Sequence, residues 1–167
     1  MLKYAPLTRS YLADFLKNLR KEDLEELKYH FKEEFEEKFE EKFIDLCLQN
    51  EKYSYLLVDD NNLPIALGGV VKIDCSGLKI GQIWLLSTKN FYKYKKSVLS
   101  CVLDKISKFK QEYDFLYNYI YFTNFNSDNW LKKVGFKFVE LKNEKFKLFY
   151  FTNKKGEKID IRRFACK

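Results

Sequence analysis

The hydrophobic period of this 167-residue chain changes near residue 50, and this change restricts the folds that the chain can adopt. Before that point, Phe31, Phe35, Phe39 and Phe43 recur every four residues between Glu and Lys, which is typical of a helix with one apolar face. After it, residues 53–58 and 63–73 have the pattern of two strands joined by a turn. We therefore expect helices packed against a sheet.

The remaining pattern predicts an α/β fold of the α+β type, with a mixed, mostly antiparallel central sheet flanked by helices. We expect a single domain over residues 1–167 and a first helix capped by Thr8 or Ser10. The predicted order is β-αα-α-βββ-α-β-α-ββ, about seven strands in all. The strands are expected near residues 2–7, 53–58, 63–73, 80–86, 115–122, 136–141 and 146–151, and the later helices at 98–109 and through 130–131.

The phenylalanine stripe is interpreted as the core-facing side of one helix. A helix that binds a partner or lies on a membrane surface is the alternative, because the stripe would be uncovered if too little of the sheet faced it.

The net charge of +7 is unevenly divided along the chain. Residues 1–60 hold 10 Lys and Arg against 15 Asp and Glu, and residues 61–167 hold 21 against 9, giving net charges of −5 and +12. A basic half suits nucleic acid, a membrane surface or nucleotide phosphates, and a solvated Lys-rich surface explains it equally well.

Nucleic-acid binding would need exposed stacking residues, for which the candidates are Tyr92, Tyr94, Tyr117, Tyr119 and Tyr121. The alternation of the last three favours burial on one strand face, so nucleic acid is a disfavoured partner.

Several other classes of protein fit the composition poorly. The apolar runs are far shorter than the ~20 residues that cross a bilayer, and the first residues lack a signal-peptide stretch, so we expect a cytoplasmic protein without a membrane span. The four cysteines lack the paired spacing of a metal site and are interpreted as free thiols; they are Cys47, Cys75, Cys101 and Cys166. His30 is the only histidine, which disfavours Ser-His or Cys-His catalysis.

Residues 124–136 carry a specific resemblance. They consist of an Asn, a predicted helix, a basic residue and a Gly-Phe pair. Gly135 can adopt the left-handed conformation that ends a helix, and Phe136 then starts a strand that returns to the core, as at many helix-to-strand turns. Together with the order of elements, this segment resembles the GNAT superfamily of N-acetyltransferases. The resemblance implies a splayed sheet that binds acetyl-CoA between its fourth and fifth strands.

A narrower resemblance covers most of the chain. The phage-encoded GNAT-like proteins share the patterns Leu-Arg-x-x-Asp, Trp-Leu-x-x-Thr and Asn-x-x-x-x-x-Asn, which stand here at residues 19–23, 84–88 and 118–124. For a phage-encoded chain the resemblance implies the host cytoplasm or the virion as location, and a host or virion protein as a partner.

The resemblance also implies acetyl-CoA as co-substrate and an amine of a small molecule or protein as acceptor. In the family, backbone N–H groups at a bulge in the fourth strand polarise the thioester carbonyl, and this task falls here to Leu85, Leu86 and Ser87. A plain buried strand explains these three residues equally well. Asn124 stands at the family's Asn and is assigned to the cofactor.

The Gly-rich loop that holds the CoA pyrophosphate in this family is missing. Residues 89–97 contain no Gly but four Lys and a Ser near a predicted helix start. We predict that Lys93, Lys95, Lys96 and Ser97 replace the loop amides as phosphate ligands; the alternative is a solvated helix start.

The family's general acid is also missing, because Leu131 stands where a Tyr usually lies four residues before the Gly of the Gly-Phe pair. Thr88 and Asn118 are the polar candidates nearest the thioester, at the expected ends of the two strands that splay apart, although structural roles fit both. Two functions remain open: an acetyl-CoA-dependent N-acetyltransferase, or a catalytically inactive phage-type protein that binds a host or virion protein.

Overall fold

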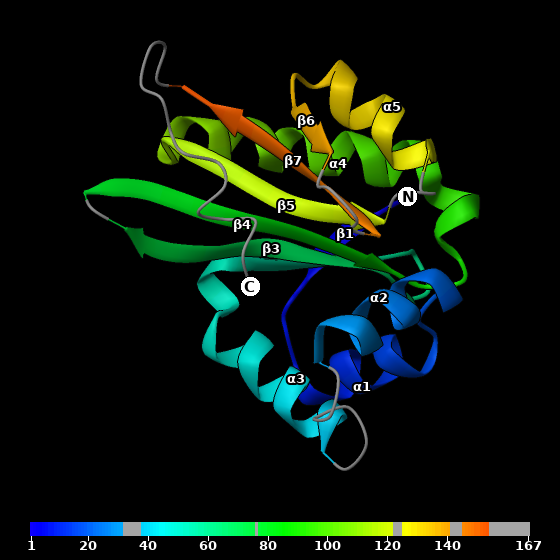
Figure 1. Ribbon diagram of the computed structural model, residues 1–167. Helices are drawn as coiled ribbons and strands as arrows, with labels where there is room; N and C mark the ends of the chain where they lie inside the picture. The colour runs from blue at the N-terminus through cyan, green and yellow to red at the C-terminus, as the bar shows by residue number, and fades with distance from the viewer. Residues whose placement is uncertain (32–37, 76, 122–124, 141–144, 154–167) are drawn as a thin grey trace. The chain divides into compact units, whose positions relative to one another are not determined.

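The computed structural model describes residues 1–31, 38–75, 77–121, 125–140 and 145–153 (Figure 1). Its contacts divide the chain into two units, Met1–Val71 with Trp84–Val102 and Lys72–Ile83 with Leu103–Lys167, and each is described by itself. The elements in chain order are β1 (Lys3–Ala5), α1 (Arg9–Lys17), α2 (Lys21–Phe31), α3 (Phe39–Gln49), the 3-10 turn η2 (Glu51–Tyr53), β2 (Ser54–Val58), β3 (Pro64–Cys75), β4 (Leu78–Ser87), α4 (Phe91–Glu112), β5 (Phe115–Tyr121), α5 (Phe125–Lys133), β6 (Lys137–Glu140) and β7 (Phe146–Thr152).

The strands form a seven-stranded mixed sheet in the order β1-β2-β3-β4-β5-β7-β6. The β1–β2, β2–β3, β5–β7 and β6–β7 pairs are antiparallel, and β4 pairs with β5 in parallel. The sheet and its flanking helices confirm the predicted fold class. The single domain over residues 1–167 stays a prediction.

The first unit buries one face of its strands under α1, α2 and α3, which lie together in Figure 1 in blue to cyan. Alternate strand residues, Leu56 and Val58 of β2, Leu67 of β3 and Leu86 of β4, belong to the same buried cluster as the apolar side chains of these helices. Residues two apart on a strand share a face, so the alternation selects which of them join the cluster. Thr8 caps α1 by accepting a hydrogen bond from the amide of Tyr11. Of the two residues predicted as caps, Thr8 and Ser10, the structure thus selects Thr8.

The phenylalanine stripe does not lie on one helix. Phe31 is the last residue of α2, whereas Phe39 and Phe43 are buried on α3, which continues to Gln49; Phe35 lies outside the described residues. The prediction of one helix was therefore wrong. A step of four residues overshoots one helical turn by about 40°, so four such positions drift around a single helix instead of staying in one seam. The burial of Phe39 and Phe43 supports the core-facing interpretation for these two residues.

The second unit contains the Gly-Phe turn that the sequence predicts. Gly135 has a φ of 87°, and the turn closes with hydrogen bonds from the amide of Gly135 to the carbonyl of Lys132 and from the amide of Phe136 to the carbonyl of Leu131, both 3.0 Å. This is the left-handed end of a helix that glycine permits. Lys110 of α4 donates to the carbonyl of Val134 in the same turn.

Candidate functional site

The turn between α1 and α2 lies along the end of β4. The amide of Arg20 donates to the carbonyl of Ser87 at 2.9 Å, Leu19 forms an isolated bridge with Thr88, and the amide of Lys89 donates to the carbonyl of Asn18 at 2.9 Å. These bonds bring together two of the three short patterns noted in the sequence, at residues 19–23 and 84–88. The sequence alone placed them far apart and gave Arg20 and Asp23 no role.

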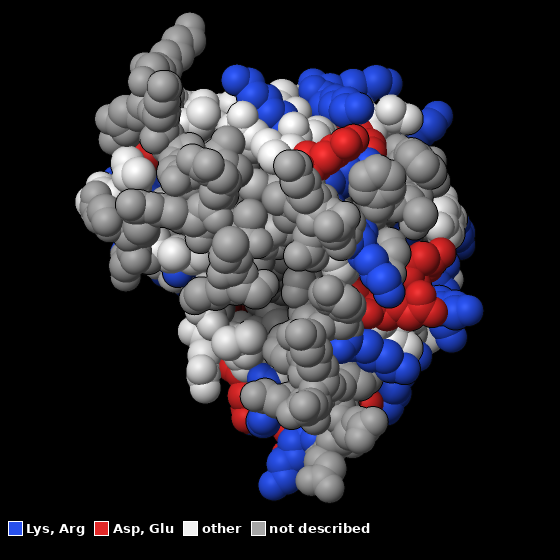
Figure 2. Space-filling view, in the orientation of Figure 1, with Lys and Arg blue, Asp and Glu red and all other residues white. Residues whose placement is uncertain are grey.

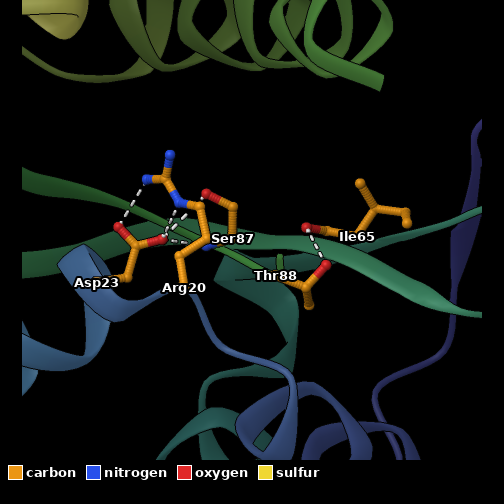
Figure 3. A network of polar contacts seen from close by, with 5 residues as sticks. All are labelled: Arg20, Asp23, Ile65, Ser87 and Thr88. Atoms are coloured by element: carbon orange, nitrogen blue, oxygen red, sulfur yellow. Dashed lines mark hydrogen bonds and ion pairs between the residues drawn. The ribbon is translucent and has the colours of Figure 1, made fainter. Parts of the chain in front are cut away.

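Asp23 is the centre of this junction (Figure 3). Its carboxylate is buried and accepts four hydrogen bonds: from Nε and Nη2 of Arg20, both at 2.9 Å, and from the amide and Oγ of Ser87 at 2.8 and 3.0 Å. A two-pronged bond between guanidinium and carboxylate is among the strongest polar contacts in proteins. Asp23 therefore fixes the start of α2 on the end of β4.

The Arg20 guanidinium lies at the start of α4. Its Cζ is 4.8 Å from the ring centroid of Phe91 and 5.7 Å from that of Tyr92. Burial alone would lower the pKa of Arg20, but the hydrogen bond and the charge of Asp23 outweigh it and raise that pKa. Arg20 thus stays charged, and Figure 3 shows its third nitrogen pointing away from the carboxylate.

Thr88 is fully buried, and its hydroxyl donates to the carbonyls of Pro64 and Ile65 at 3.0 and 3.3 Å. Its amide also donates to the carbonyl of Ile65 at 3.0 Å. These bonds join the end of β4 to the start of β3. A catalytic role for Thr88 stays a prediction, and its hydroxyl proton is already used in this contact.

The three residues assigned to the thioester differ in their surroundings. Leu86 belongs to the buried cluster under α1–α3, whereas Leu85 is half-buried. The amide of Ser87 is donated to Asp23, so it is not free for a thioester carbonyl in this arrangement. The assignment of the cofactor to Leu85, Leu86 and Ser87 stays a prediction.

Helix α4 begins at Phe91, earlier than the apolar pattern predicts, so that three of the four lysines of residues 89–97 fall in its first turns and Lys89 lies before it. Lys93, Lys95, Lys96 and Ser97 are all exposed, and the first turn holds no acidic residue. The free amides of a helix start attract anions, and ammonium groups in the first turns add to that attraction. Lys93 also lies beside the aromatic ring of Tyr94, with its Nζ 5.3 Å from the ring centroid.

A tyrosine ties this helix start to the β2–β3 turn. Tyr94 donates to Asp59 at 3.0 Å, and Asp59 also accepts from the amides of Asn61 and Leu63 at 2.9 and 3.0 Å. Burial would raise the pKa of Asp59, but the hydrogen bonds from Leu63, Tyr94 and Asn61 outweigh it and hold that pKa below its ordinary value. Asp59 is thus a fixed anion that positions the start of α4.

Glu26, one turn after Asp23 on α2, was not singled out by the sequence. It is half-buried, and burial raises its pKa to about 7; the charges of Asp23 and Glu22 add to this rise, and Arg20 opposes it. In Figure 2, acidic side chains gather on the visible face over the region where Figure 1 shows α2. On α2, Glu26 differs from Glu25, whose side chain is 65% exposed and whose Oε1 is 4.0 Å from Nζ of Lys21.

The remaining predicted residues belong to the second unit. Oδ1 of Asn118 accepts from Nε2 of Gln82 at 3.1 Å and from the amide of Tyr119 at 2.8 Å, so its side chain is held in place. A role for Asn118 in catalysis stays a prediction. Asn124 lies outside the described residues. Leu131, at the position of the family's general acid, is buried.

The second unit also contains a buried ion pair that the sequence did not reveal. Lys147 of β7 donates to Oδ2 of Asp128 on α5, while Oδ1 of Asp128 has no hydrogen-bond partner in the described part of the chain. The sequence pattern does not indicate this pair, because Asp128 has the pattern of an ordinary acidic residue in the first turn of a helix and Lys147 that of an exposed strand residue.

Residues 1–31, 38–75, 77–121, 125–140 and 145–153 contain no group of three or more His, Cys, Asp or Glu placed to hold a metal ion. Within the same ranges, no helix combines the length and the apolar character that crossing a bilayer requires.

Comparison with known proteins finds a similarity in sequence to a phage protein. No protein-family model matches the chain. The chain is 31% identical over 91 residues to the probable scaffold protein gp13 of Escherichia phage T7, a match that covers 53% of this chain and 63% of that protein. The match thus spans less than two thirds of the relative's length.

Solved structures are similar over nearly the whole chain. An acetyltransferase of the GNAT family from Staphylococcus aureus Mu50 has a TM-score of 0.62 at 12% identity, covering 92% of this chain and 100% of that one. The spermidine N-acetyltransferase from Vibrio cholerae, in complex with CoA and spermine, has a TM-score of 0.63 at 16% identity, covering 90% and 95%. With the seven-stranded mixed sheet and its flanking helices, these similarities show that the chain has the GNAT acyltransferase fold.

Proposed function

We propose that this protein is an acyl-CoA-dependent N-acyltransferase that transfers an acetyl group from acetyl-CoA to an amine of a small molecule or protein. The observation that carries the proposal is the similarity of fold over nine tenths of the chain to a spermidine N-acetyltransferase in complex with CoA. Fold alone does not fix chemistry, so the residues of the site must supply the rest.

The start of α4 supplies the phosphate end of the site. Lys93, Lys95 and Lys96 are exposed and carry a charge opposite to that of the CoA phosphates. They take the part of the Gly-rich loop that the sequence lacks, and they act as point charges on flexible stems instead of as fixed amides. The contact of Tyr94 with Asp59 holds the first turns of the helix in place.

The reaction itself needs little besides positioning and proton transfer. The lone pair of the neutral amine attacks the thioester carbonyl carbon, the C–S bond breaks, and CoA leaves as a thiolate that takes up a proton. Holding the amine and thioester together can contribute about 7–11 kcal/mol of the barrier reduction. The absence of a Tyr at Leu131 leaves the thiolate to be protonated by solvent or by the departing amine proton.

Calorimetric titration of acetyl-CoA into the purified protein tests the proposal. We expect micromolar binding, weakened at least tenfold when Lys93, Lys95 and Lys96 are all changed to Ala. Lys108, Lys133 and Lys137 are also exposed, so changing these three to Ala is the control that makes the same change of net charge elsewhere. No binding at millimolar acetyl-CoA would rule out the acyltransferase.

A phage-type binding protein without turnover is the second candidate, and two observations favour it. The sequence match is to a phage protein named a probable scaffold, and the amide of Ser87 is already bonded to Asp23. This candidate predicts a host or virion protein as partner, no binding of acetyl-CoA and no release of CoA in the presence of amines. The same titration therefore separates the two functions.

A further inference from the structure

Arg20 has more hydrogen-bond donors than its contacts use. A guanidinium group carries five N–H donors in one plane. Nε and Nη2 each give one of them to the Asp23 carboxylate, both at 2.9 Å. The others, one on Nη2 and two on Nη1, donate to no group among the described residues. One N–H of Nη1 and the free N–H of Nη2 are parallel, so this second edge of Arg20 can hold two oxygens of one ligand group.

The second edge of Arg20 lies on the far side of the guanidinium from its carboxylate partner. Figure 3 shows Nη1 pointing away from Asp23 and Ser87. The Arg20 side chain is 17% exposed, and in the described part of the chain Nη1 is not one of the buried atoms that lack a partner. A ligand can therefore reach this edge without displacing Asp23.

The guanidinium is held in a fixed orientation. Asp23 holds one of its edges, and Asp23 is itself fixed by the amide and hydroxyl of Ser87. The ring centroids of Phe91 and Tyr92 lie 4.8 and 5.7 Å from its Cζ. A donor group that is already oriented loses little conformational freedom when a ligand binds, so more of the interaction energy appears as affinity.

The charges around this edge favour an anion. Asp23 balances the positive charge of Arg20, and the described first turn of α4 contains no acidic residue. The other carboxylate that acts on Arg20, that of Glu22, is exposed, where water and salt screen its charge. Lysines 93, 95 and 96 are exposed in the first two turns of α4, whose first residues contact Arg20. An anionic group at the second edge thus meets a positively charged surface.

We propose that Arg20 is an oxyanion-binding residue that takes a phosphate or a carboxylate on its Nη1–Nη2 edge, beside the start of α4. Two oxygens of the ligand group accept the two parallel N–H bonds, while the Nε–Nη2 edge stays on Asp23. This site goes beyond the proposed function, because it requires no turnover. Within that function, the group it takes is either a phosphate of CoA or a carboxylate on the acyl chain.

The test titrates inorganic pyrophosphate and, separately, malonate into the protein in the absence of acetyl-CoA, followed by calorimetry. We expect wild type to bind at least one of them with a millimolar or lower Kd. Arg20→Lys keeps the charge but loses the parallel donors, and should weaken that binding at least about fivefold. Arg9→Lys is the matched control, because Arg9 also pairs with an aspartate, Asp45, but at the surface; its affinity should stay within about twofold of wild type.

The two probes and the acetyl-CoA titration decide separate points. Binding of pyrophosphate alone assigns the edge to a phosphate, and binding of malonate alone assigns it to a carboxylate. If both bind, acetyl-CoA is compared with acetyl-pantetheine, which has no nucleotide phosphates; a loss in Arg20→Lys confined to acetyl-CoA assigns the edge to a phosphate, and an equal loss for both assigns it to a carboxylate.

The site is refuted if neither probe binds wild type, or if Arg20→Lys binds as wild type does, and the proposed function then depends on the acetyl-CoA titration alone. Conversely, a protein that binds a probe through Arg20 but does not bind acetyl-CoA keeps the site and loses the acyltransferase. If Arg20→Lys does not fold, nitrogen-15 NMR of the arginine side chains in wild type replaces it. The chain has only four arginines, and Arg20 signals that do not shift on addition of either probe refute the site.

Discussion

Replacing Asp23 by alanine removes the carboxylate that joins α2 to β4. The side chains of Arg20 and Asp23 are only 17% and 6% exposed, so the change leaves a largely buried guanidinium without its partner. It also leaves the amide and hydroxyl of Ser87 without their acceptor. Breaking a buried ion pair from one side costs about 3–5 kcal/mol, and the contacts of Arg20 with two aromatic rings persist. We therefore expect a loss near the lower figure, about 3 kcal/mol.

Urea denaturation of wild type and Asp23→Ala measures this loss, and thermal unfolding should show a fall in Tm of roughly 6–12 °C for a chain of this size. Asp45→Ala is the matched control, because Asp45 pairs with Arg9 at the surface, where their side chains are 48% and 64% exposed. Such exposed pairs contribute about 0–1 kcal/mol. An Asp23→Ala loss no greater than that of Asp45→Ala would refute the reasoning.

Two further predictions concern the packing around the site and the Gly-Phe turn. Lys110→Met should lower the free energy of unfolding by about 1–2 kcal/mol in urea denaturation. It removes the donor to the Val134 carbonyl and an ammonium group 4.1 Å from the centroid of the Phe151 ring. An unchanged denaturation midpoint would mean that water replaces the donor. Gly69→Ala should cost 2 kcal/mol or more, because a Cβ there would lie 2.5 Å from the Tyr53 carbonyl oxygen, which is backbone and cannot swing away. A stability loss below about 0.5 kcal/mol would show that β2 and β3 shift apart without strain.

The sequence predicted those features that depend on neighbours along the chain. Alternation gave the strands, and Gly135 before Phe136 gave the left-handed end of α5. The start of α4 was placed too late, because its first two turns are mostly exposed and lysine-rich, so that the apolar pattern becomes visible only at Val98. The prediction of a single helix over the phenylalanine stripe was wrong, because apolar spacing alone does not show where a helix ends.

The junction between Asp23 and Ser87 could not be predicted, because these two residues are 64 positions apart in the chain. The backbone amide of Ser87 has no side-chain signature, so no motif could show that it is donated to a carboxylate. Glu26 illustrates a second limit. In the sequence it is indistinguishable from its neighbour Glu25, and only the fold makes one half-buried and the other exposed.

The contact between Asp23 and the amide of Ser87 bears directly on whether the chain is an enzyme. The missing Tyr at Leu131 and the occupied amide of Ser87 both weaken a comparison with the usual acyltransferase site, because each removes a group that acts on the thioester. Neither acts on the acceptor amine, which must lose a proton before it can attack. Asp23, fixed by four hydrogen bonds, supplies an anion that positions the end of β4, where the thioester would lie. The titration of acetyl-CoA into wild type and into the triple lysine variant therefore separates the acyltransferase from the inactive alternative, because only the first requires the start of α4 to hold a phosphate.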